Sequence, residues 1–447
     1  MNESHGRKRN GNRKSGKSPV EIYSFPLPAP DDVKVEVNGA KVRPCQMKNA
    51  DFCAFSASSG YEVLVEINEP IRKAHVRPLK RGIKPVIKGK ILSFKAKGAG
   101  DLVIDIPGRK PLFLYVSAPD TDIPSPRDPK VKYFKAGKIH EAGEIVLHDN
   151  ETLYIEGGAV VRGCVRALKS KNVKIRGHGI IDACNYPKGE RRTIVFDQCV
   201  DSSIEGIISI NPASWMTVLG ACERITVRGL REIGDVLSSD GIDICGCRDI
   251  LVEDCTFMCN DDGVVIKSLN LKNPLDSLND WSRDVENIIT RRCIFLQQSG
   301  AAMEIGHELR TKMVRNIRFE DCDIVAIHGF GSAFSIRNAD RALVKDVYYE
   351  NIRVEHHYYR LVDIRVLKSM WSKDEERGYV ENIFFKNIQA ALTIYNPGYS
   401  FSLVSGFDPD HKVRNVVFED FFVDGKKVSS VHELDLYTRD AEDIAFR

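Results

Sequence analysis

The chain has 447 residues, of which 43% are hydrophobic and 28% are charged, as in ordinary folded proteins. A formal net charge of +3 is too small to indicate binding to nucleic acid or to an anionic membrane. No apolar run reaches the roughly 18 residues that a membrane-spanning helix requires, and the N-terminal region lacks the apolar segment of a secretory signal. We therefore expect a cytoplasmic protein, or a secreted one if a signal has been removed.

The first part of the chain divides into a tail, a small domain and a linker. Residues 1–19 combine basic side chains with Gly, Asn and Ser, which is typical of a disordered tail. Residues 20–120 contain short alternating runs of apolar and polar residues, such as 33–37 and 62–67, and this pattern predicts an antiparallel β-sandwich. The Pro-rich residues 121–129 predict a stiff linker.

A repeated unit runs through residues 130–447. It consists of two polar residues, an apolar residue that we call the anchor, any residue and a second apolar residue, as in 223–227 and 248–252. The anchors are Val173, Ile204, Ile225, Ile250, Ile288, Ile317, Val347, Ile383 and Val416. Their intervals vary, which suits stacked coils that keep their strands and differ in their loops, and no sustained helical period is present.

Equivalent positions of these units predict an inward-facing column. Five residues after the seven anchors from Ile225 onwards stand Leu230, Cys255, Cys293, Cys322, Ile352, Ile388 and Phe421, and all are apolar. In a parallel β-helix such positions stack ~4.8 Å apart. We therefore predict an all-β chain, in which a right-handed parallel β-helix over residues 130–447 follows the sandwich. We interpret the cysteines as packed hydrophobic side chains rather than as disulfides or metal ligands.

Three acidic residues stand at matching places in two neighbouring units. Asp240 lies in Ser-Asp-Gly, residues 239–241, and Asp261 and Asp262 follow one repeat later in Asn-Asp-Asp-Gly, residues 260–263. If each repeat is one coil, the three carboxylates meet, provided that a turn or bulge between Asp261 and Asp262 turns both to one side. Crowding raises the pKa of at least one carboxyl, which then stays protonated as a general acid while the others activate a water. This is the chemistry that splits a glycosidic bond.

Two other interpretations of these acids stay open. Asp-Asp beside Gly is common in turns, where carboxylates accept hydrogen bonds from backbone N–H groups. Clustered carboxylates are also the ligands that calcium prefers, and calcium-dependent lyases use related scaffolds. The paired sequences one repeat apart, with Lys267 nearby, favour a reaction centre over an isolated turn.

Residues 239–243 and 260–268 resemble the acidic motifs of the polygalacturonases, glycoside hydrolase family 28, and of the related dextranase and isopullulanase family 49. The resemblance covers the predicted β-helix, and the sandwich before it is similar to family 49. Family 28 members are right-handed parallel β-helices that hydrolyse with inversion. The resemblance implies that Asp261 is the proton donor and that Asp240 and Asp262 hold the attacking water, with no metal or organic cofactor.

The same resemblance indicates residues for substrate binding. Residues 211–215 are similar to a family segment upstream of the acids, so Trp215 is either a sugar-stacking platform or a turn-packing side chain. Family 28 has Gly-His-Gly where this chain has Gly-Ala-Ala at 300–302, and Arg-Ile-Lys where it has Ser-Ile-Arg at 335–337. Those basic groups hold galacturonate carboxylates in the family, so Arg337 is either a carboxylate clamp or a partner of neutral hydroxyls.

Further polar candidates are Glu304 and His307, in the coil after the aspartates, and Lys267, which either tunes the aspartates and binds substrate or forms a surface salt bridge. We therefore expect an inverting glycoside hydrolase that acts on a pectin-like or α-glucan-like poly- or oligosaccharide, with a carbohydrate as its partner and neither nucleic acid nor a membrane. The alternatives are a calcium-dependent polysaccharide lyase and a non-catalytic carbohydrate-binding β-helix.

Overall fold

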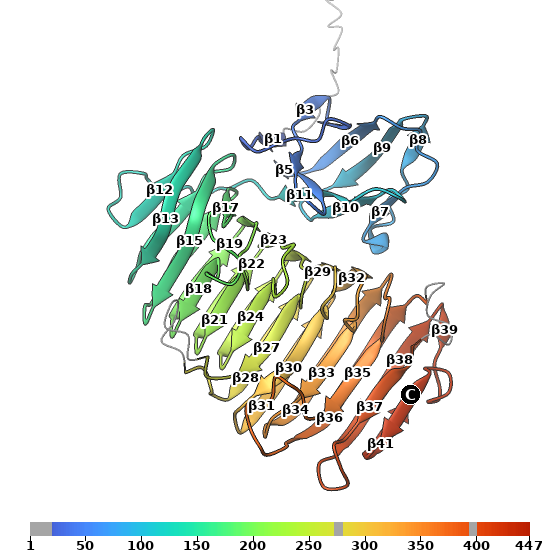
Figure 1. The fold of residues 1–447 in the computed structure, drawn as a ribbon. Coiled ribbons are helices and arrows are strands. Elements are labelled where there is room, and N and C mark those ends of the chain that lie inside the picture. Colours follow the sequence, from blue (N-terminus) through green and yellow to red (C-terminus); the bar gives the residue numbers. More distant parts are fainter. Residues whose placement is uncertain (1–19, 272–279, 393–399) are drawn as a thin grey trace, which may run out of the picture.

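The chain folds into a small β-sandwich followed by a long β-solenoid (Figure 1). A computed structural model describes residues 20–271, 280–392 and 400–447. The predicted disordered tail, residues 1–19, lies outside the described residues. Within them the helical element is the 3₁₀ turn η1 (Leu79–Arg81), and no helix there is long and apolar enough to cross a membrane.

The N-terminal domain consists of two sheets that share one core. The six-stranded sheet contains β1 (Val20–Tyr23), β4 (Cys45–Gln46), β5 (Asp51–Ala57), β7 (His75–Arg77), β10 (Leu102–Asp105) and β11 (Leu112–Ser117). The five-stranded sheet contains β2 (Val33–Val37), β3 (Ala40–Val42), β6 (Gly60–Ile67), β8 (Val86–Lys88) and β9 (Ile91–Lys97). One pair departs from the expected antiparallel pattern. Strands β5 and β11 run parallel, because the strands between them in sequence form a crossover connection.

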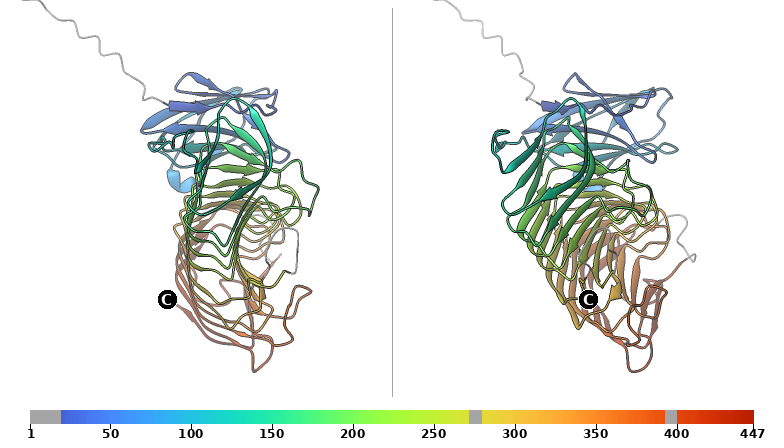
Figure 2. Two further views of the ribbon diagram at one scale, coloured as in Figure 1. Left: turned by 90° about the vertical axis from the view of Figure 1, so that its left-hand side faces the viewer. Right: turned by 60° about the vertical axis from the view of Figure 1, so that its left-hand side comes forward.

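The remaining strands form a right-handed parallel β-helix with three sheets along its length (Figure 2). Sheet 1 contains β18 (Ile194–Asp197), β21 (Thr217–Gly220), β24 (Ile242–Cys245), β27 (Val264–Ser268), β30 (Met303–Leu309), β33 (Phe334–Asn338), β35 (Val362–Val366), β37 (Ser402–Ser405) and β40 (Leu436–Arg439). Sheet 2 contains β12 (Val131–Phe134), β14 (Thr152–Ile155), β16 (Lys174–Gly177), β19 (Val200–Glu205), β22 (Glu223–Arg228), β25 (Arg248–Glu253), β28 (Val285–Arg291), β31 (Met313–Glu320), β34 (Leu343–Val354), β36 (Tyr379–Ala390), β38 (Val413–Val423) and β41 (Ala441–Phe446). Sheet 3 contains β13 (Ile139–Leu147), β15 (Val160–Leu168), β17 (Ile180–Asp182), β20 (Ile208–Ile210), β23 (Arg231–Ile233), β26 (Thr256–Met258), β29 (Ile294–Gln297) and β32 (Asp323–Ile327), and the ends of β34, β36 and β38 extend it. The short β39 (Lys426–Lys427) pairs antiparallel with β38.

The polar residue before most anchors marks a bend in a sheet 2 strand. It is left-handed, with φ between 51° and 59°, at Asp249, Asn287, Asn316, Asp346, Asn382 and Asn415. Asn and Asp tolerate this backbone conformation better than most residues, because their short polar side chains bond locally. They also bond from coil to coil, as where the Asn316 side-chain NH₂ group donates to the side-chain Oδ1 of Asn287 at 2.6 Å. The bends therefore account for the polar part of the repeat.

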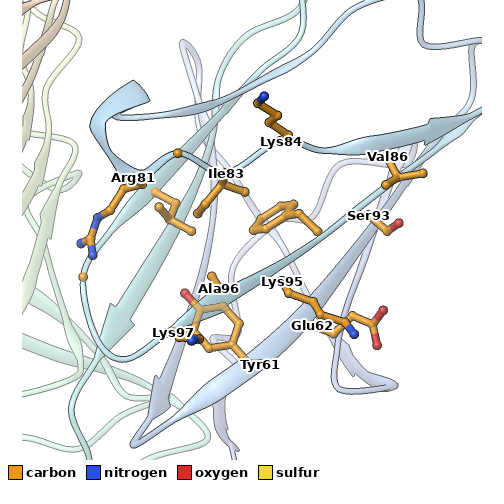
Figure 3. A pocket seen from close by; sticks show the side chains of 14 residues that line it. Tyr61, Glu62, Arg81, Ile83, Lys84, Val86, Ser93, Lys95, Ala96 and Lys97 are labelled. Carbon is orange, nitrogen blue, oxygen red and sulfur yellow. The ribbon is translucent and has the colours of Figure 1, made fainter.

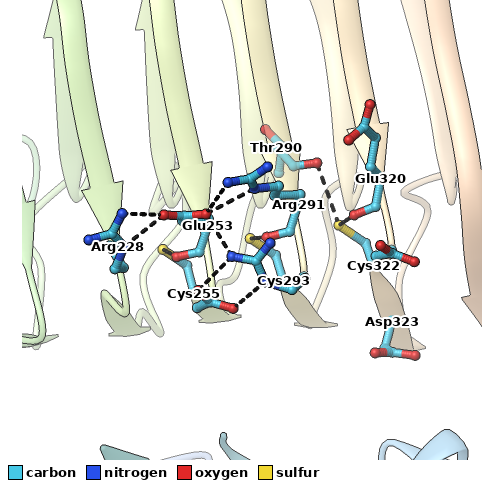
Figure 4. Close-up of polar contacts among 12 residues, drawn as sticks. Arg228, Glu253, Cys255, Thr290, Arg291, Cys293, Glu320, Cys322 and Asp323 are labelled. Atoms are coloured by element: carbon cyan, nitrogen blue, oxygen red, sulfur yellow. Dashed lines mark hydrogen bonds and ion pairs between the residues drawn. The ribbon is translucent and has the colours of Figure 1, made fainter. Parts of the chain in front are cut away.

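The interior column predicted from the repeat is confirmed. Cys255, Cys293 and Cys322 are fully buried in successive coils (Figure 4), and each is a free thiol whose sulfur lies 3.2–3.4 Å from the backbone carbonyl two residues earlier. A second column stacks the rings of Phe319, Tyr349, Phe385, Phe418 and Phe446, with centroids 4.9–5.1 Å apart. These separations follow the spacing of hydrogen-bonded strands, so the core is built from ladders of like side chains.

The N-terminal domain packs against sheet 3. Phe52 and Tyr115 of the domain share an apolar cluster with Met258 of the solenoid. In the same interface, Arg231 donates to both carboxylate oxygens of Asp101, each at 3.0 Å, and both side chains are buried. A bidentate pair of this kind is geometrically specific. It holds the domain on sheet 3, while the acids predicted to be catalytic lie at sheet 1.

Candidate active site

The three aspartates stand where the chain enters sheet 1. The Gly241 N–H donates to the Asp262 carbonyl at 2.8 Å, and the Met216 N–H donates to the Asp240 carbonyl at 2.9 Å. This ladder places Trp215, Asp240 and Asp262 at one position of three successive coils. Acids that are one repeat apart in sequence are therefore neighbours in space, because adjacent coils lie ~4.8 Å apart.

Asp240 is held by a buried cation. The Lys267 ammonium group lies 2.8 Å from Asp240 Oδ2 and 2.6 Å from Asp243 Oδ1, and 4.0 Å from the centre of the Trp215 ring. Asp240 is only 3% exposed, Lys267 5% and Asp243 0%. Burial alone lowers the pKa of Lys267, but the charges of Asp240 and Asp243 outweigh burial and raise that pKa well above its ordinary value. Lys267 is therefore a permanent positive charge beneath the acids, not a surface lysine.

Asp261 and Asp262 are half-buried and crowded. The Asp262 N–H donates to Asp261 Oδ1 at 3.1 Å, and the Ala301 N–H donates to Asp262 Oδ1 at 2.6 Å. Burial, followed by the charges of Asp262 and Asp240, raises the pKa of Asp261 to about 7. Burial and the charge of Asp240 raise the pKa of Asp262 to about 6, against the opposing charges of Arg337 and Lys267. At neutral pH Asp261 is therefore the more protonated of the two, and Asp262 is mostly ionised.

Glu304 and Arg337 adjoin the aspartates on the next two coils. Glu304 lies between the inward-facing Met303 and Ile305, so it is on the outer side of sheet 1, yet it is fully buried. Its carboxylate lies 3.6 Å from the Arg337 guanidinium. Burial raises the pKa of Glu304 to about 8, with Arg337 opposing this rise and Asp262 adding to it. Glu304 is therefore mostly protonated at neutral pH, so it does not neutralise the charge of Arg337.

His307 lies at the edge of this group. Its Nδ1 is 3.2 Å from the Ser369 hydroxyl. Burial, together with the charges of Arg337 and Arg365, lowers the pKa of His307 to about 3, so the ring is neutral at neutral pH. Among the eight residues predicted for the site, Trp215, Lys267 and the three aspartates thus form its centre, Glu304 and Arg337 flank it, and His307 is the most peripheral.

Sequence reasoning missed two members of this group. Asp243 belongs to the acidic motif but is not among the predicted site residues, although the alternation of β24 places it on the outer face. Arg192, whose guanidinium lies 4.7 Å from the Trp215 ring centre, occurs two residues before β18, at the register position of Trp215 and Asp240. Extending the repeat one coil towards the N-terminus would have found it.

Two features bear on other interpretations of the chain. Among the described residues, no group of three or more His, Cys, Asp or Glu side chains is placed to hold a metal ion. A cavity of about 660 Å³ lies in the N-terminal domain and is lined by Tyr61, Ile83 and Val86 together with several lysines (Figure 3). All of its lining residues belong to that domain, so this cavity is separate from the aspartates.

Comparisons with known proteins agree with this fold. Dex49A from Penicillium minioluteum superposes with a TM-score of 0.67 over 96% of each chain, at 10% identity. A family 28 exopolygalacturonase from Yersinia enterocolitica gives 0.52 over 87% of this chain and 96% of that one, also at 10% identity. Identities this low show a common fold alone.

In sequence, a protein named as a probable polygalacturonase from Arabidopsis thaliana is 23% identical over 216 residues, which are 47% of this chain. They are 44% of that protein, so the match spans less than half of its length. The profile of the glycosyl hydrolases family 28 matches residues 145–431, which include every sheet 1 strand except β40 and all eight predicted site residues. The chain therefore belongs to glycosyl hydrolases family 28.

Proposed function

We propose that the chain is an inverting glycoside hydrolase in which Asp261 is the general acid and Asp262, with Asp240, activates the attacking water. The observation that carries this proposal is the stacking of Asp240 and Asp262 in successive coils with Asp261 beside them. Like charges this close are costly for stability, so their cluster on a half-buried face is better explained by acid–base chemistry.

The order of the two pKa values supports the division of roles. Asp261, at about 7, keeps its proton at a pH where most of Asp262, at about 6, has lost its own. A general acid and a general base work best when their pKa values bracket the operating pH. The Lys267 ammonium group donates to the Oδ2 of Asp240 at 2.8 Å, and we assign the Oδ1 of Asp240 to the water.

The reaction then proceeds in one displacement. The water attacks the anomeric carbon from the face opposite the leaving sugar and gives its proton to Asp262. The bond between this carbon and the glycosidic oxygen breaks, and that oxygen takes the proton of Asp261. Inversion requires the acid and base to be far enough apart to admit water, roughly 6.5–9.5 Å. Trp215, beside Lys267, would border the sugar at this point.

A uronic-acid-containing, pectin-like substrate fits the surrounding charge better than a neutral glucan. Arg337 is 15% exposed, and its partner Glu304 is mostly protonated. Its other carboxylate, Asp363 at 3.3 Å, is shared with Arg360 and Arg365. Positive charge therefore remains next to the aspartates for a sugar carboxylate.

The test is a reducing-end assay over pectic, α-glucan and α-galactoside oligomers, with Asp261→Asn as the blank. We expect release from a uronic-acid-containing oligomer, with the inverted anomer as the first product in proton NMR. A calcium-dependent lyase would instead form unsaturated product that absorbs in the near ultraviolet, and a chelator would stop it. A binding module would retain the sugar and release no reducing ends.

A further inference from the structure

A second hollow lies farther along sheet 1. A cavity of about 430 Å³, which we call the C-terminal pocket, is formed by β35, β37, β40 and the segments beside them. Its charged lining is basic: Arg360, Arg365, Lys368 and Arg439 contribute to it, and no acidic residue of the described chain lines it.

The C-terminal pocket lies on the same face as the aspartates. Arg365 is the register partner of Arg337 on the next coil, and Arg439 occupies the same position two coils later, opposite Ser405. These side chains alternate with the inward-facing Ile364 and Val404. Strands β35 to β40 are three to five coils beyond β27, which corresponds to ~14–24 Å along the solenoid.

The buried carboxylate of Asp363, below this pocket, does not neutralise all of the positive charge of the nearby arginines. Asp363 is fully buried and lies 2.7 Å from Arg365, 3.3 Å from Arg337 and 3.4 Å from Arg360. One carboxylate thus serves three guanidinium groups. Arg439 is 59% exposed, and among the residues that the structure describes it forms an ion pair with Asp440, at 3.5 Å. An arginine with free donors in a hollow is well suited to bidentate binding of a carboxylate.

Aromatic rings complete the lining. Phe401 is 47% exposed and Tyr437 is 53% exposed, although both are large side chains that usually pack inside. Their ring centres are 6.0 Å apart, and the Arg360 guanidinium lies 5.2 Å from the centre of Phe401. Exposed rings beside guanidinium groups offer an apolar surface for the C–H face of a pyranose and donors for its carboxylate.

We propose that the C-terminal pocket is a distal, non-catalytic site for a carboxylate-bearing sugar unit of the same chain whose glycosidic bond reaches the aspartates. This inference rests on the proposed function and extends it, because it makes the enzyme selective for long uronic-acid oligomers. A 1,4-linked chain that lies along sheet 1 advances by nearly one coil per pyranose, so a hexamer spans both places and a dimer does not.

The first test measures binding without turnover. Asp261→Asn is titrated calorimetrically with hexagalacturonate, and Arg439→Gln is added in the same background. We expect Arg439→Gln to bind the hexamer about tenfold more weakly, because one charge-assisted pair is lost. We expect a comparable loss of affinity for Tyr437→Ala. The matched control is Arg414→Gln, an exposed arginine of sheet 2 that pairs with Glu442, which should leave the dissociation constant unchanged. Equal affinity of Arg439→Gln and Arg414→Gln for the hexamer would overturn the proposal. It would also be overturned if binding of inorganic phosphate depended on Arg439 and binding of the hexamer did not.

The second test separates this site from the proposed function. With Asp261 intact, the ratio of kcat/KM for hexamer to that for dimer should fall about tenfold in Arg439→Gln and stay constant in Arg414→Gln. Hydrolysis with an unchanged ratio would overturn the distal site alone. Binding of hexamer that depends on Arg439, without release of reducing ends from any oligomer, would support the site and overturn the hydrolase.

Discussion

The outer face of sheet 1 carries opposite charge at two places. One is the group around Asp240, Asp261 and Asp262, which we call the aspartate centre, and the other is the C-terminal pocket. At the aspartate centre, Lys267 is shared by two buried carboxylates, and Asp261 and Asp262 crowd beside them. Below the C-terminal pocket, the buried carboxylate of Asp363 is shared by three arginines. The backbone is the same ladder at both ends.

The difference shows which chemical properties the outward-facing side chains of a solenoid sheet can provide. Buried carboxyl groups that outnumber the nearby cations cannot all stay ionised. Their pKa values therefore rise, and one of them keeps a proton that it can donate. An excess of positive charge on arginine cannot be relieved by losing protons, because the guanidinium stays charged, so it is relieved by binding an anion. Acid–base chemistry and anion binding can therefore stand a few coils apart on one rigid sheet.

The largest effect that we expect is the loss of turnover in Asp261→Asn. An amide cannot deliver the proton to the leaving oxygen, so kcat/KM should fall about 10²–10⁴-fold for substrates with a sugar leaving group. The measurement is the initial rate of reducing-end release, and the control is Asp201→Asn, an exposed acid that pairs with Arg224 on sheet 2. Retention of native rates would remove Asp261 from the reaction.

The stability of the same variant separates a catalytic acid from a turn-capping one. The folded-state pKa of Asp261, about 7, lies above its ordinary value of 3.8. The stability that it contributes is therefore greatest below pH 4 and is lost as the pH rises through 7. At pH 8 the Asn variant should be at least as stable to urea as the native chain. A clear loss of stability at pH 8 would mean that the carboxylate mainly caps the turn.

The second effect is on folding and concerns Lys267. Replacing it by Met removes a cation that buried Asp240 and Asp243 share, and breaking a buried pair in this way costs about 3–5 kcal/mol. The matched control is Lys386→Met, whose exposed contact with Glu419 at 3.1 Å should be worth less than about 1 kcal/mol. Urea unfolding measures both. Similar losses in the two variants would show that the charges at the aspartate centre are already compensated by water.

The repeat in the sequence was sufficient for the fold and for the location of the acids. The apolar column through Cys255 and Cys293 follows from a period that backbone pairing imposes, and Asp240 and Asp262 share a register in that period. The direction of long side chains is not encoded in the period. Lys267 pairs with Cys245 along the backbone, but its side chain reaches back to Asp240.

The C-terminal pocket was not predictable for a related reason. Its arginines come from coils whose loops differ in length, and each occurs in an ordinary strand or turn sequence, so no local motif marks them. Only the register between β33 and β40 brings them together. Asp363 and Arg365, which alternate with the apolar residues of β35, are the signal that could have indicated a buried charge cluster.

The third effect is a narrow pH profile. Below about pH 6 Asp262 gains a proton and cannot accept one from water, and above about pH 7 Asp261 loses the proton that it must donate. The plot of kcat/KM against pH should therefore be bell-shaped, falling about tenfold per pH unit on each side. Initial rates from pH 4 to about 9, measured with a substrate whose leaving sugar is uncharged, test this. A profile flat across this range would show that a different pair of groups titrates.

The smallest effect is the response to salt, which should act on one end of the face and not on the other. The screening length falls from ~10 Å at 0.1 M salt to ~3 Å at 1 M, and it weakens exposed charges far more than buried ones. Arg439 is exposed, whereas the titrating Asp261 and Asp262 are half-buried beside the buried Lys267. Binding of hexagalacturonate to Asp261→Asn should therefore weaken severalfold over this range, and less in Arg439→Gln, while the midpoints of the native pH profile should hold nearly constant. If salt moves the midpoints as strongly as it weakens hexamer binding, the aspartate centre is as open to solvent as the C-terminal pocket, and the contrast between the two ends fails.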